Sequence, residues 1–293
     1  MKLLYSKPFV EKIEKEILRK TRKMKAPPVL AIVLAGNDPA SLSYVKRKEQ
    51  TAKKLGCEAK LFHMLTDTNE AEIITLIKKI NTDKKILGMI VQLPLPDKFN
   101  TDKIISMIKK SKDVDNLRGD SPFISPSTQA IWTLINVAGN PRTQRAEQSR
   151  RAQWSNPRQG DEASDEASYD GKPSKKANVL IVGYGKIIGR PMHAFLLKKK
   201  FTNIEIADRK TKNLQLLAKK ADIIISGAGQ ANLIKDIKKG AVVIDAGASL
   251  HKGKIAGDVD IKRAAKKAKL ITPVPGGVGP LTVTYLFKNL INT

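Results

Sequence analysis

The sequence predicts an α/β protein with two domains. Short, continuous apolar runs such as Val29 to Leu34 are typical of buried parallel strands. Segments with helical spacing separate these runs, and this alternation indicates right-handed βαβ units around a parallel sheet. A glycine-rich turn at residues 183–189 follows one such run and precedes a helical segment, which is typical of a Rossmann-type dinucleotide-binding domain.

The composition is that of an ordinary globular protein. The chain has 293 residues, enough for two domains, with 41% hydrophobic and 28% charged residues. No apolar run approaches the roughly 20 residues that span a bilayer, and the N-terminus lacks the apolar segment of a signal peptide. The single cysteine, Cys57, excludes an intrachain disulfide, and three scattered histidines argue against a metal centre. We therefore expect a soluble, cytoplasmic protein with no metal site.

The chain is strongly basic, with a formal net charge of +26 from 54 Lys and Arg against 28 Asp and Glu. Such a charge raises the prospect of nucleic acid or another polyanion as a partner. The lysines are nevertheless spread through predicted helices, aromatic residues are only 5%, and no nucleic-acid motif is present. Solvated helix faces explain the charge more simply, so nucleic acid is not the expected partner.

The first domain, expected at residues 1–130, alternates helices and strands. Phe9, Ile13 and Ile17 lie at helical spacing, which predicts an amphipathic first helix. Asn69 and Glu72 form a capping pair at the start of another helix. The expected helices cover residues 7–25, 41–55, 69–80 and 101–110, and the expected strands cover 29–34, 60–65 and 86–93.

The second domain, expected at residues 131–276, contains an unusual polar segment. No Ile, Leu, Val, Met or Phe occurs between Val137 and Val179, and residues 140–176 are rich first in arginine and then in acidic residues. Such a segment cannot bury enough apolar area to offset its ordering entropy, so we expect a mobile surface insertion. The domain should begin with a helix from Ile131. Its expected strands cover residues 178–182, 203–207, 222–226, 241–246 and 269–272.

The glycine-rich turn contains Gly183, Gly185 and Gly189 and has one residue more than the common dinucleotide spacing. A turn of this kind brings backbone N–H groups and a helix N-terminus to a pyrophosphate. The alternative interpretation is a tight packing turn without a ligand. The next strand ends at Asp208 and Arg209, where an acid suits the ribose 2′-hydroxyl of NAD and a base suits the 2′-phosphate of NADP, so cofactor choice stays open.

Several polar residues of the first domain are candidates for chemistry. Tyr44 and Lys48 share one helix face with Ser41. Lys48 could be a general acid or base if burial lowered its pKa, although a solvated lysine is the commoner case. Gln92 lies at the end of a predicted strand, where open α/β sheets bind ligands. Asp115 could accept hydrogen bonds from an amino-pyrimidine ring, or it could be an ordinary turn aspartate.

A shaped loop precedes a C-terminal helix expected at residues 281–290. Residues 271–282 contain three prolines and three glycines, which restrict and bend the backbone. This loop, together with four other motifs, resembles the bifunctional methylenetetrahydrofolate dehydrogenase/cyclohydrolase family over nearly the whole chain. The other motifs are Ser41-x-x-Tyr44-x-x-x-Lys48, Val91-Gln92-Leu93-Pro94-Leu95-Pro96, Lys112-Asp113-Val114-Asp115 and Gly257-Asp258-Val259-Asp260.

The resemblance implies a role for each candidate residue. Lys48 would be the central acid/base, Gln92 would tune it, Tyr44 would lie against the folate ring, and Asp115 would hold the pterin end. Pro275, Gly276 and Gly277 would shape the folate pocket, in a cleft between a three-layer N-terminal domain and the Rossmann-type domain. Residues 277–293 would pack back on the N-terminal domain. The implied cofactor contacts are Gly183, Tyr184, Gly185, Gly189, Asp208, Arg209 and Ala248.

The implied activity is oxidation of 5,10-methylenetetrahydrofolate with NADP, or NAD, and hydrolysis of the methenyl product to 10-formyltetrahydrofolate by a homodimer. The chain departs from the family pattern at Tyr184, where an arginine is usual, and at Asn116, where a glycine is usual. Two alternatives stay open: a member retaining only the cyclohydrolase activity, and a basic polyanion-binding protein on a degenerate enzyme scaffold.

Overall fold

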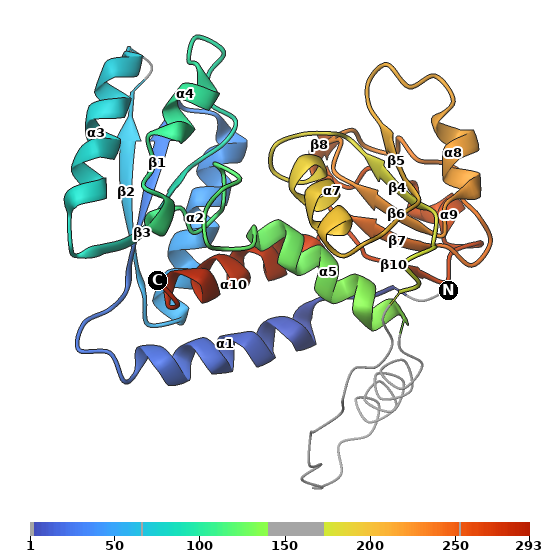
Figure 1. Ribbon diagram of the computed structural model, residues 1–293, viewed down its shortest axis with the longest axis horizontal. Coiled ribbons are helices and arrows are strands. Elements are labelled where there is room, and N and C mark those ends of the chain that lie inside the picture. Colours follow the sequence, from blue (N-terminus) through green and yellow to red (C-terminus); the bar gives the residue numbers. More distant parts are fainter. Residues whose placement is uncertain (1–2, 66, 140–172, 252) are drawn as a thin grey trace, which may run out of the picture. The chain divides into compact units, whose positions relative to one another are not determined.

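The computed structural model describes residues 3–65, 67–139, 173–251 and 253–293. The chain divides into two compact units (Figure 1). The first unit contains Ser6–Gln129 and Gly279–Thr293, and the second contains Met1–Tyr5 and Ala130–Val278. Both are built on parallel sheets, as the sequence predicts. Most of the expected insertion, residues 140–172, lies outside the described residues.

The sheet of the first unit has three parallel strands in the order β2-β1-β3. The strands are β1 (Val29–Ala35), β2 (Glu58–Met64) and β3 (Ile86–Val91). The central strand β1 is buried along almost its whole length, which is why it is apolar at every position. Its register places Val33 beside Val91, so the carboxyl ends of β1 and β3 meet at one edge of the sheet.

Five α-helices and one short 3-10 helix of the described residues precede, connect or follow these strands. They are α1 (Lys7–Thr21), α2 (Pro39–Lys54), α3 (Glu70–Thr82), α4 (Thr101–Ser106), the 3-10 helix η1 (Lys110–Lys112) and α5 (Pro126–Gly139). Three predicted helix boundaries are wrong by four residues or more. The first helix ends at Thr21, four residues before the expected end. The helix expected to begin at Ile131 starts five residues earlier, at Pro126, because proline suits the first helical turn.

The third wrong boundary is the helix expected through Lys110, which ends at Ser106. The side chain of Asn81 donates to the carbonyl of Met107 at 2.7 Å and accepts from the N–H of Lys109 at 2.9 Å. A neighbouring element therefore takes the backbone groups that a continuing helix would pair internally.

The C-terminal helix α10 (Val278–Leu290) begins three residues before its predicted start and packs within the first unit along most of its length. Phe287 and Leu290 are fully buried. The amide of Asn289 donates to the carbonyls of Val114 and Ile124 at 2.8 and 3.0 Å and accepts from Gln129 at 3.0 Å. These bonds tie the end of the chain to the loop that follows η1.

The second unit has a five-stranded parallel sheet in the order β10-β7-β6-β4-β5. The strands of this sheet are β4 (Val179–Val182), β5 (Ile204–Ala207), β6 (Ile223–Ser226), β7 (Val242–Asp245) and β10 (Leu270–Ile271), and the helices are α7 (Gly189–Lys198), α8 (Leu214–Lys220) and α9 (Ile261–Ala264). The chain passes from β4 to β5 on one side and then to β6 on the other. This reversal is the switch point at which such sheets bind ligands.

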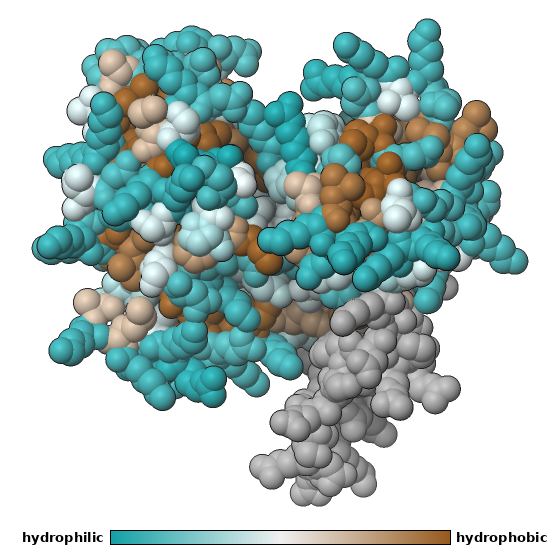
Figure 2. Space-filling view, viewed as in Figure 1, coloured by the Kyte–Doolittle hydropathy of each residue, from teal (hydrophilic) through white to brown (hydrophobic). Residues whose placement is uncertain are grey.

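The sequence analysis did not predict a small antiparallel hairpin formed by β8 (Ser249–His251) and β9 (Lys254–Ala256). Both strands have only three residues, and none of their side chains is buried, so they carry no pattern of core-facing residues. Figure 2 shows hydrophilic side chains over much of the visible face of each unit, as the lysine-rich composition requires. Within the described part of the chain, no helix combines the length and apolar character needed to cross a membrane.

We expect Gly88 to be irreplaceable in the first unit. A Cβ at this position would lie 2.6 Å from Val114 Cγ1 and 2.9 Å from Leu290 Cδ1, inside a packed core. Gly88→Ala should lower the free energy of unfolding by about 1–3 kcal/mol through overpacking, measured by urea denaturation. Gly279→Ala is the matched control, because no atom of the described residues, apart from its chain neighbours and its own helix backbone, lies within 4 Å of its added Cβ. Equal stability of the two variants would contradict this packing.

Candidate active site

Lys48 lies in the third turn of α2. The helix begins after Asp38, whose carboxylate accepts from the backbone N–H of Ser41 at 2.7 Å, and Pro39 provides a preset φ for the first turn. In the basic run Lys46-Arg47-Lys48, the first two side chains are exposed and that of Lys48 is half-buried. Its ammonium donates to Gln92 Oε1 at 2.7 Å. The structure therefore places this lysine against the first unit's sheet edge and not on a solvated helix face.

Gln92 follows the last residue of β3 and is almost fully buried. Its backbone N–H donates to the carbonyl of Val33 at 2.8 Å, which continues the ladder between β1 and β3. Its side-chain Nε2 donates to the carbonyl of Leu93 at 2.8 Å. Because the amide nitrogen is committed to Leu93, the amide oxygen must face Lys48.

Asp115 interacts electrostatically with Lys48 and is the third residue of the group formed with Gln92. Burial lowers the pKa of Lys48, and the carboxylate of Asp115 partly opposes that lowering. Burial also raises the pKa of Asp115, and the ammonium of Lys48 partly opposes that rise. Each charge thus stabilises the other, yet desolvation dominates for both, so a neutral amine at Lys48 is favoured relative to a lysine in water.

The loop carrying Asp115 is shaped by its neighbour Asp113, which is fully buried. The carboxylate of Asp113 accepts from the backbone N–H groups of Leu117 and Arg118 at 3.0 and 2.9 Å, which closes the loop around Asp115. Asn116 has a φ of +53°, in the left-handed region that asparagine tolerates better than most residues. This backbone explains how Asn116 can stand where a glycine is usual.

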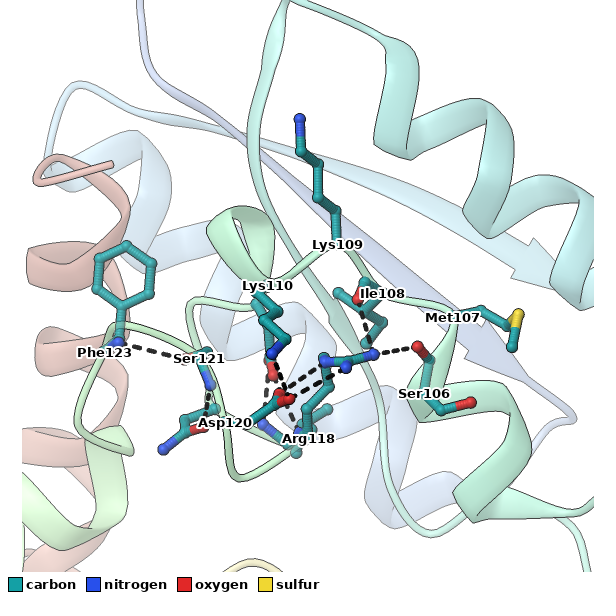
Figure 3. Close-up of polar contacts among 12 residues, drawn as sticks. Ser106, Met107, Ile108, Lys109, Lys110, Arg118, Asp120, Ser121 and Phe123 are labelled. Atoms are coloured by element: carbon teal, nitrogen blue, oxygen red, sulfur yellow. Dashed lines mark hydrogen bonds and ion pairs between the residues drawn. The ribbon is translucent and has the colours of Figure 1, made fainter.

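Arg118 fastens the other end of the loop (Figure 3). Its guanidinium donates to the carbonyls of Ser106 and Ile108 and to the carboxylate of Asp120, with Nε 2.8 Å from Asp120 Oδ1. Lys110 also pairs with Asp120, at 2.9 Å. The segment after α4 and the loop of Asp115 are thereby joined through one arginine. The sequence analysis missed this role of Arg118, because the two backbone carbonyls that it bonds lie ten or more residues away along the chain.

Tyr44 lies one helical turn before Lys48, on the same face of α2, as predicted from the spacing. Its ring is partly exposed, and the guanidinium of Arg47 lies 6.0 Å from the ring centroid. Ser41, a further turn back, is buried, and its hydroxyl has no hydrogen-bond partner among the described residues. The helix therefore presents an aromatic surface next to a titratable amine.

The glycine-rich turn of the second unit fits a dinucleotide. Gly183 has a φ of +88°, which side chains rarely adopt. A Cβ at Gly189 would lie 2.1 Å from the carbonyl oxygen of Gly183, so the turn closes tightly onto the start of α7. At Gly185 no atom of the residues that the structure describes, apart from the chain neighbours, lies within 4 Å of an added Cβ, which leaves open space at this point of the turn. Backbone and a helix N-terminus are thus available to a phosphate group.

Tyr184 and its neighbours form a small aromatic and basic group beside this turn. The Tyr184 hydroxyl lies 2.9 Å from His193 Nδ1, and the two rings meet edge to face. The guanidinium of Arg190 lies 5.9 Å from the Tyr184 ring centroid. The arginine usual at position 184 is absent, but a guanidinium still lies beside the residue that replaces it.

Asp208 and Arg209 follow β5, on the neighbouring strand. Asp208 Oδ1 accepts from the backbone N–H of Lys210 at 2.9 Å and from the Thr211 hydroxyl at 3.2 Å. This oxygen is therefore engaged in hydrogen bonds within the turn at residues 208–211. Arg209 is exposed, and its guanidinium has no hydrogen-bond or ion-pair partner within the described ranges. Ala248 is exposed in the loop after β7, where its carbonyl lies 4.0 Å from an added Cβ of Gly229.

Pro275, Gly276 and Gly277 belong to the second unit and form a sharply bent loop after β10. The Val274–Pro275 peptide bond is cis, and Gly276 has a φ of +104°. A Cβ at Gly277 would lie 2.6 Å from the carbonyl oxygen of Pro273. The backbone therefore requires both glycines, in agreement with a shaped loop.

Comparison with known proteins decides the family. Residues 4–115 match the family described as tetrahydrofolate dehydrogenase/cyclohydrolase, catalytic domain, and residues 167–293 match its NAD(P)-binding domain. The chain belongs to the tetrahydrofolate dehydrogenase/cyclohydrolase family. The resemblance seen in the sequence motifs is confirmed, and the two matched domains carry the lysine group and the glycine-rich turn respectively.

Relatives of this family match the chain over almost its full length. The bifunctional protein FolD of Lactobacillus helveticus is 36% identical over 304 residues, covering 99% of this chain and 96% of that protein. The structure of the Campylobacter jejuni bifunctional FolD methylenetetrahydrofolate dehydrogenase/cyclohydrolase is 31% identical with a TM-score of 0.80, covering 100% of this chain and 98% of that one. The Trypanosoma brucei enzyme, solved with NADP and an inhibitor, is 25% identical with a TM-score of 0.80 and coverages of 98% and 95%.

Proposed function

We propose that this chain oxidises 5,10-methylenetetrahydrofolate to the methenyl form with NADP and hydrolyses the methenyl form to 10-formyltetrahydrofolate, in one-carbon metabolism. The observation that carries the proposal is the Lys48 amine, which is hydrogen-bonded to Gln92 and electrostatically coupled to Asp115 in the matched catalytic domain. A buried amine with a lowered pKa suits a substrate that passes through a cation, because a second positive charge nearby would be unfavourable.

Lys48 is the central acid/base in this proposal, and its proton transfer belongs to the hydrolytic step. In the hydrolytic step, water oxygen bonds to the methenyl carbon while a water proton moves to the neutral amine. The carbon–N5 bond then breaks, N5 gains a proton, the former water oxygen becomes the formyl oxygen, and one proton is released overall. Because Gln92 Oε1 accepts one amine N–H, the amine lone pair stays available to the water.

The other residues of the group bind and orient the substrate. Tyr44 offers its exposed ring to the folate ring, and Asp115 accepts from the pterin end. Pro275, Gly276 and Gly277 shape the pocket through their bent backbone. We assign these contacts from the match to the family, from the position of Tyr44 one turn before Lys48, and from the coupling of Asp115 to that lysine.

The cofactor is held in this proposal by the turn of Gly183, Tyr184, Gly185 and Gly189, with Ala248 on the loop after β7. When bound, NADP accepts the hydride from the methylene carbon. We favour NADP over NAD because Asp208 uses one carboxylate oxygen within its own turn, whereas the exposed Arg209 guanidinium can meet a 2′-phosphate. The chain's role is to bind and orient the nicotinamide.

We also propose that the protein acts in the cytoplasm as a homodimer. The β8–β9 hairpin supports an association between copies, because Leu250 is 79% exposed and Ile255 is 42% exposed. Light scattering coupled to gel filtration measures the mass in solution directly. A monomer at micromolar concentration would overturn the assembly and leave the catalytic proposal intact.

The catalytic role of Lys48 is tested by Lys48→Gln in a cyclohydrolase assay that follows loss of methenyl absorbance. The amide cannot take a proton from water, so turnover should fall about 100-fold or more. Lys46→Gln is the matched control, because it removes an exposed lysine two residues away on the same helix and should leave turnover unchanged. Full turnover of Lys48→Gln would refute the role.

The pH dependence of hydrolysis tests the coupling between Lys48 and Asp115. The rate should rise with pH as the amine loses its proton, with a midpoint below the usual lysine pKa of 10.5. Asp115 favours the charged ammonium, so Asp115→Asn should move that midpoint to still lower pH. Asp97→Asn is the control, since Asp97 is not among the charges that act on Lys48. A midpoint that stays in place or rises in Asp115→Asn would contradict the coupling.

Cofactor choice is tested by dehydrogenase assays with NADP and NAD in parallel. Arg209→Ala should raise the KM for NADP about tenfold or more and leave the KM for NAD nearly unchanged, because a charge-assisted hydrogen bond is lost. Lys210→Ala, at the next exposed position, is the control. A parent enzyme that prefers NAD, or an Arg209→Ala variant with an unchanged KM for NADP, would contradict the assignment.

A further inference from the structure

Two fully buried aspartates of the second unit lie outside the residues proposed to react. Asp245 is the last residue of β7, and Asp258 lies between β9 and α9, within the Gly257-Asp258-Val259-Asp260 motif. Each carboxylate accepts three hydrogen bonds from the described residues. Neither aspartate takes part in the chemistry proposed above. Both carboxylates instead bond to backbone N–H groups of neighbouring loops.

Asp258 holds the loop that follows β6. Its Oδ2 accepts from the Ser226 hydroxyl at 2.6 Å and from the backbone N–H of Ala228 at 2.7 Å. Its Oδ1 accepts from the backbone N–H of Gln230 at 2.7 Å. One carboxylate therefore accepts hydrogen bonds from both ends of the short segment between Ala228 and Gln230.

Asp245 in turn holds the segment that carries Asp258. Its Oδ1 accepts from the N–H groups of Gly247 and Asp258 at 3.0 and 3.1 Å, and its Oδ2 accepts from the N–H of Val259 at 2.9 Å. Burial raises the pKa of Asp245 to about 7, and the charge of Asp258 adds to that rise. The hydrogen bonds of the two carboxylates thus connect the end of β7, through the segment of Asp258, to the loop after β6.

Two glycines show that the backbone is built around these carboxylates. A Cβ at Gly247 would lie 2.1 Å from Asp258 Cγ, and a Cβ at Gly257 would lie 2.1 Å from Asp245 Oδ2. Non-bonded heavy atoms do not approach each other this closely. A side chain at either position would push a carboxylate out of its place.

The loop after β6 lies directly against the glycine-rich turn. A Cβ at Gly183 would lie 2.8 Å from the Cα and N atoms of Ala228 and from the carbonyl oxygen of Gly227. The strand order puts β6 beside β4, at the switch point of the sheet. Any shift of Ala228 therefore reaches the turn that is proposed to meet the cofactor phosphates.

We propose that Asp258, itself held by Asp245, is a positioning residue for the dinucleotide cofactor, because it fixes Ala228 and Gln230 against the Gly183 turn. The inference rests on the proposed function, in that the turn must be the cofactor site. If Asp258 positions this loop, its replacement should impair one activity and not the other. Cofactor binding should weaken, while the hydrolytic step, which consumes no dinucleotide, should continue in the other unit.

The test is Asp258→Asn in the full-length protein. An amide has one acceptor oxygen, so its NH₂ group must face either the N–H of Gln230 or the donors at Ala228 and Ser226. We expect the KM for NADP to rise about tenfold, with kcat and cyclohydrolase turnover within about twofold of the parent. Gly247→Ala should give the same defect by displacing the carboxylate sterically.

Asp260→Asn is the matched control. Asp260 belongs to the same motif, but its carboxylate caps α9 by accepting from Arg263 N–H at 3.2 Å and does not reach the loop after β6. Its KM for NADP should match the parent. An unchanged KM in both Asp258→Asn and Gly247→Ala would overturn the inference. Equal loss of both activities with a lower unfolding midpoint would also overturn it, since Asp258 would then only stabilise the unit.

Direct binding separates this inference from the proposed function. If the parent has neither activity, the proposed function fails, and calorimetric titration with NADP still tests the positioning role. Binding to the parent with about tenfold weaker binding to Asp258→Asn would support it. Equal affinities, or no NADP binding to the parent, would overturn it.

Discussion

The hydrogen bond between Lys48 and Gln92, with Asp115 as the electrostatic partner, is the interaction on which the chemistry proposed for the first unit depends. A buried ammonium is costly unless it is hydrogen-bonded and paired. Here one carbonyl oxygen at 2.7 Å and one carboxylate offset part of that cost. The remaining desolvation keeps the amine easier to deprotonate than an ordinary lysine, and this makes it usable as a base.

The surrounding fold serves to hold those groups. Gln92 is fixed because its backbone continues the ladder to β1 and its amide nitrogen is bonded to Leu93. The Asp115 loop is fixed by the buried carboxylate of Asp113, by the guanidinium of Arg118, and by Asn289 of the C-terminal helix, which bonds to Val114. The loop of the proposed active site is thus held in place by contacts from distant parts of the chain. In the second unit, Asp245 and Asp258 use the same principle, with buried carboxylates ordering backbone N–H groups.

Much of this could be predicted from the sequence, for physical reasons. The apolar runs of β1 and β3 and the glycine-rich turn depend on local chemistry, and Lys48, Gln92 and Asp115 lie in recognisable motifs. Other features depend on contacts between remote residues. Asn81 ends α4 early, Arg118 bonds to carbonyls of Ser106 and Ile108, and Asp258 reaches Ala228, thirty residues away. The β8–β9 hairpin is too short and exposed to leave a pattern.

The central claim is that burial poises Lys48 as a base, and its direct test is titration of that one amine by NMR in the protein without folate. Labelled lysine, assigned with Lys48→Gln as the reference, would report the pKa of the amine itself. The account predicts a value clearly below the usual 10.5. A pKa at or above 10.5 would mean that Asp115 and Gln92 outweigh burial, and Lys48 would then be a fixed cation and not a base.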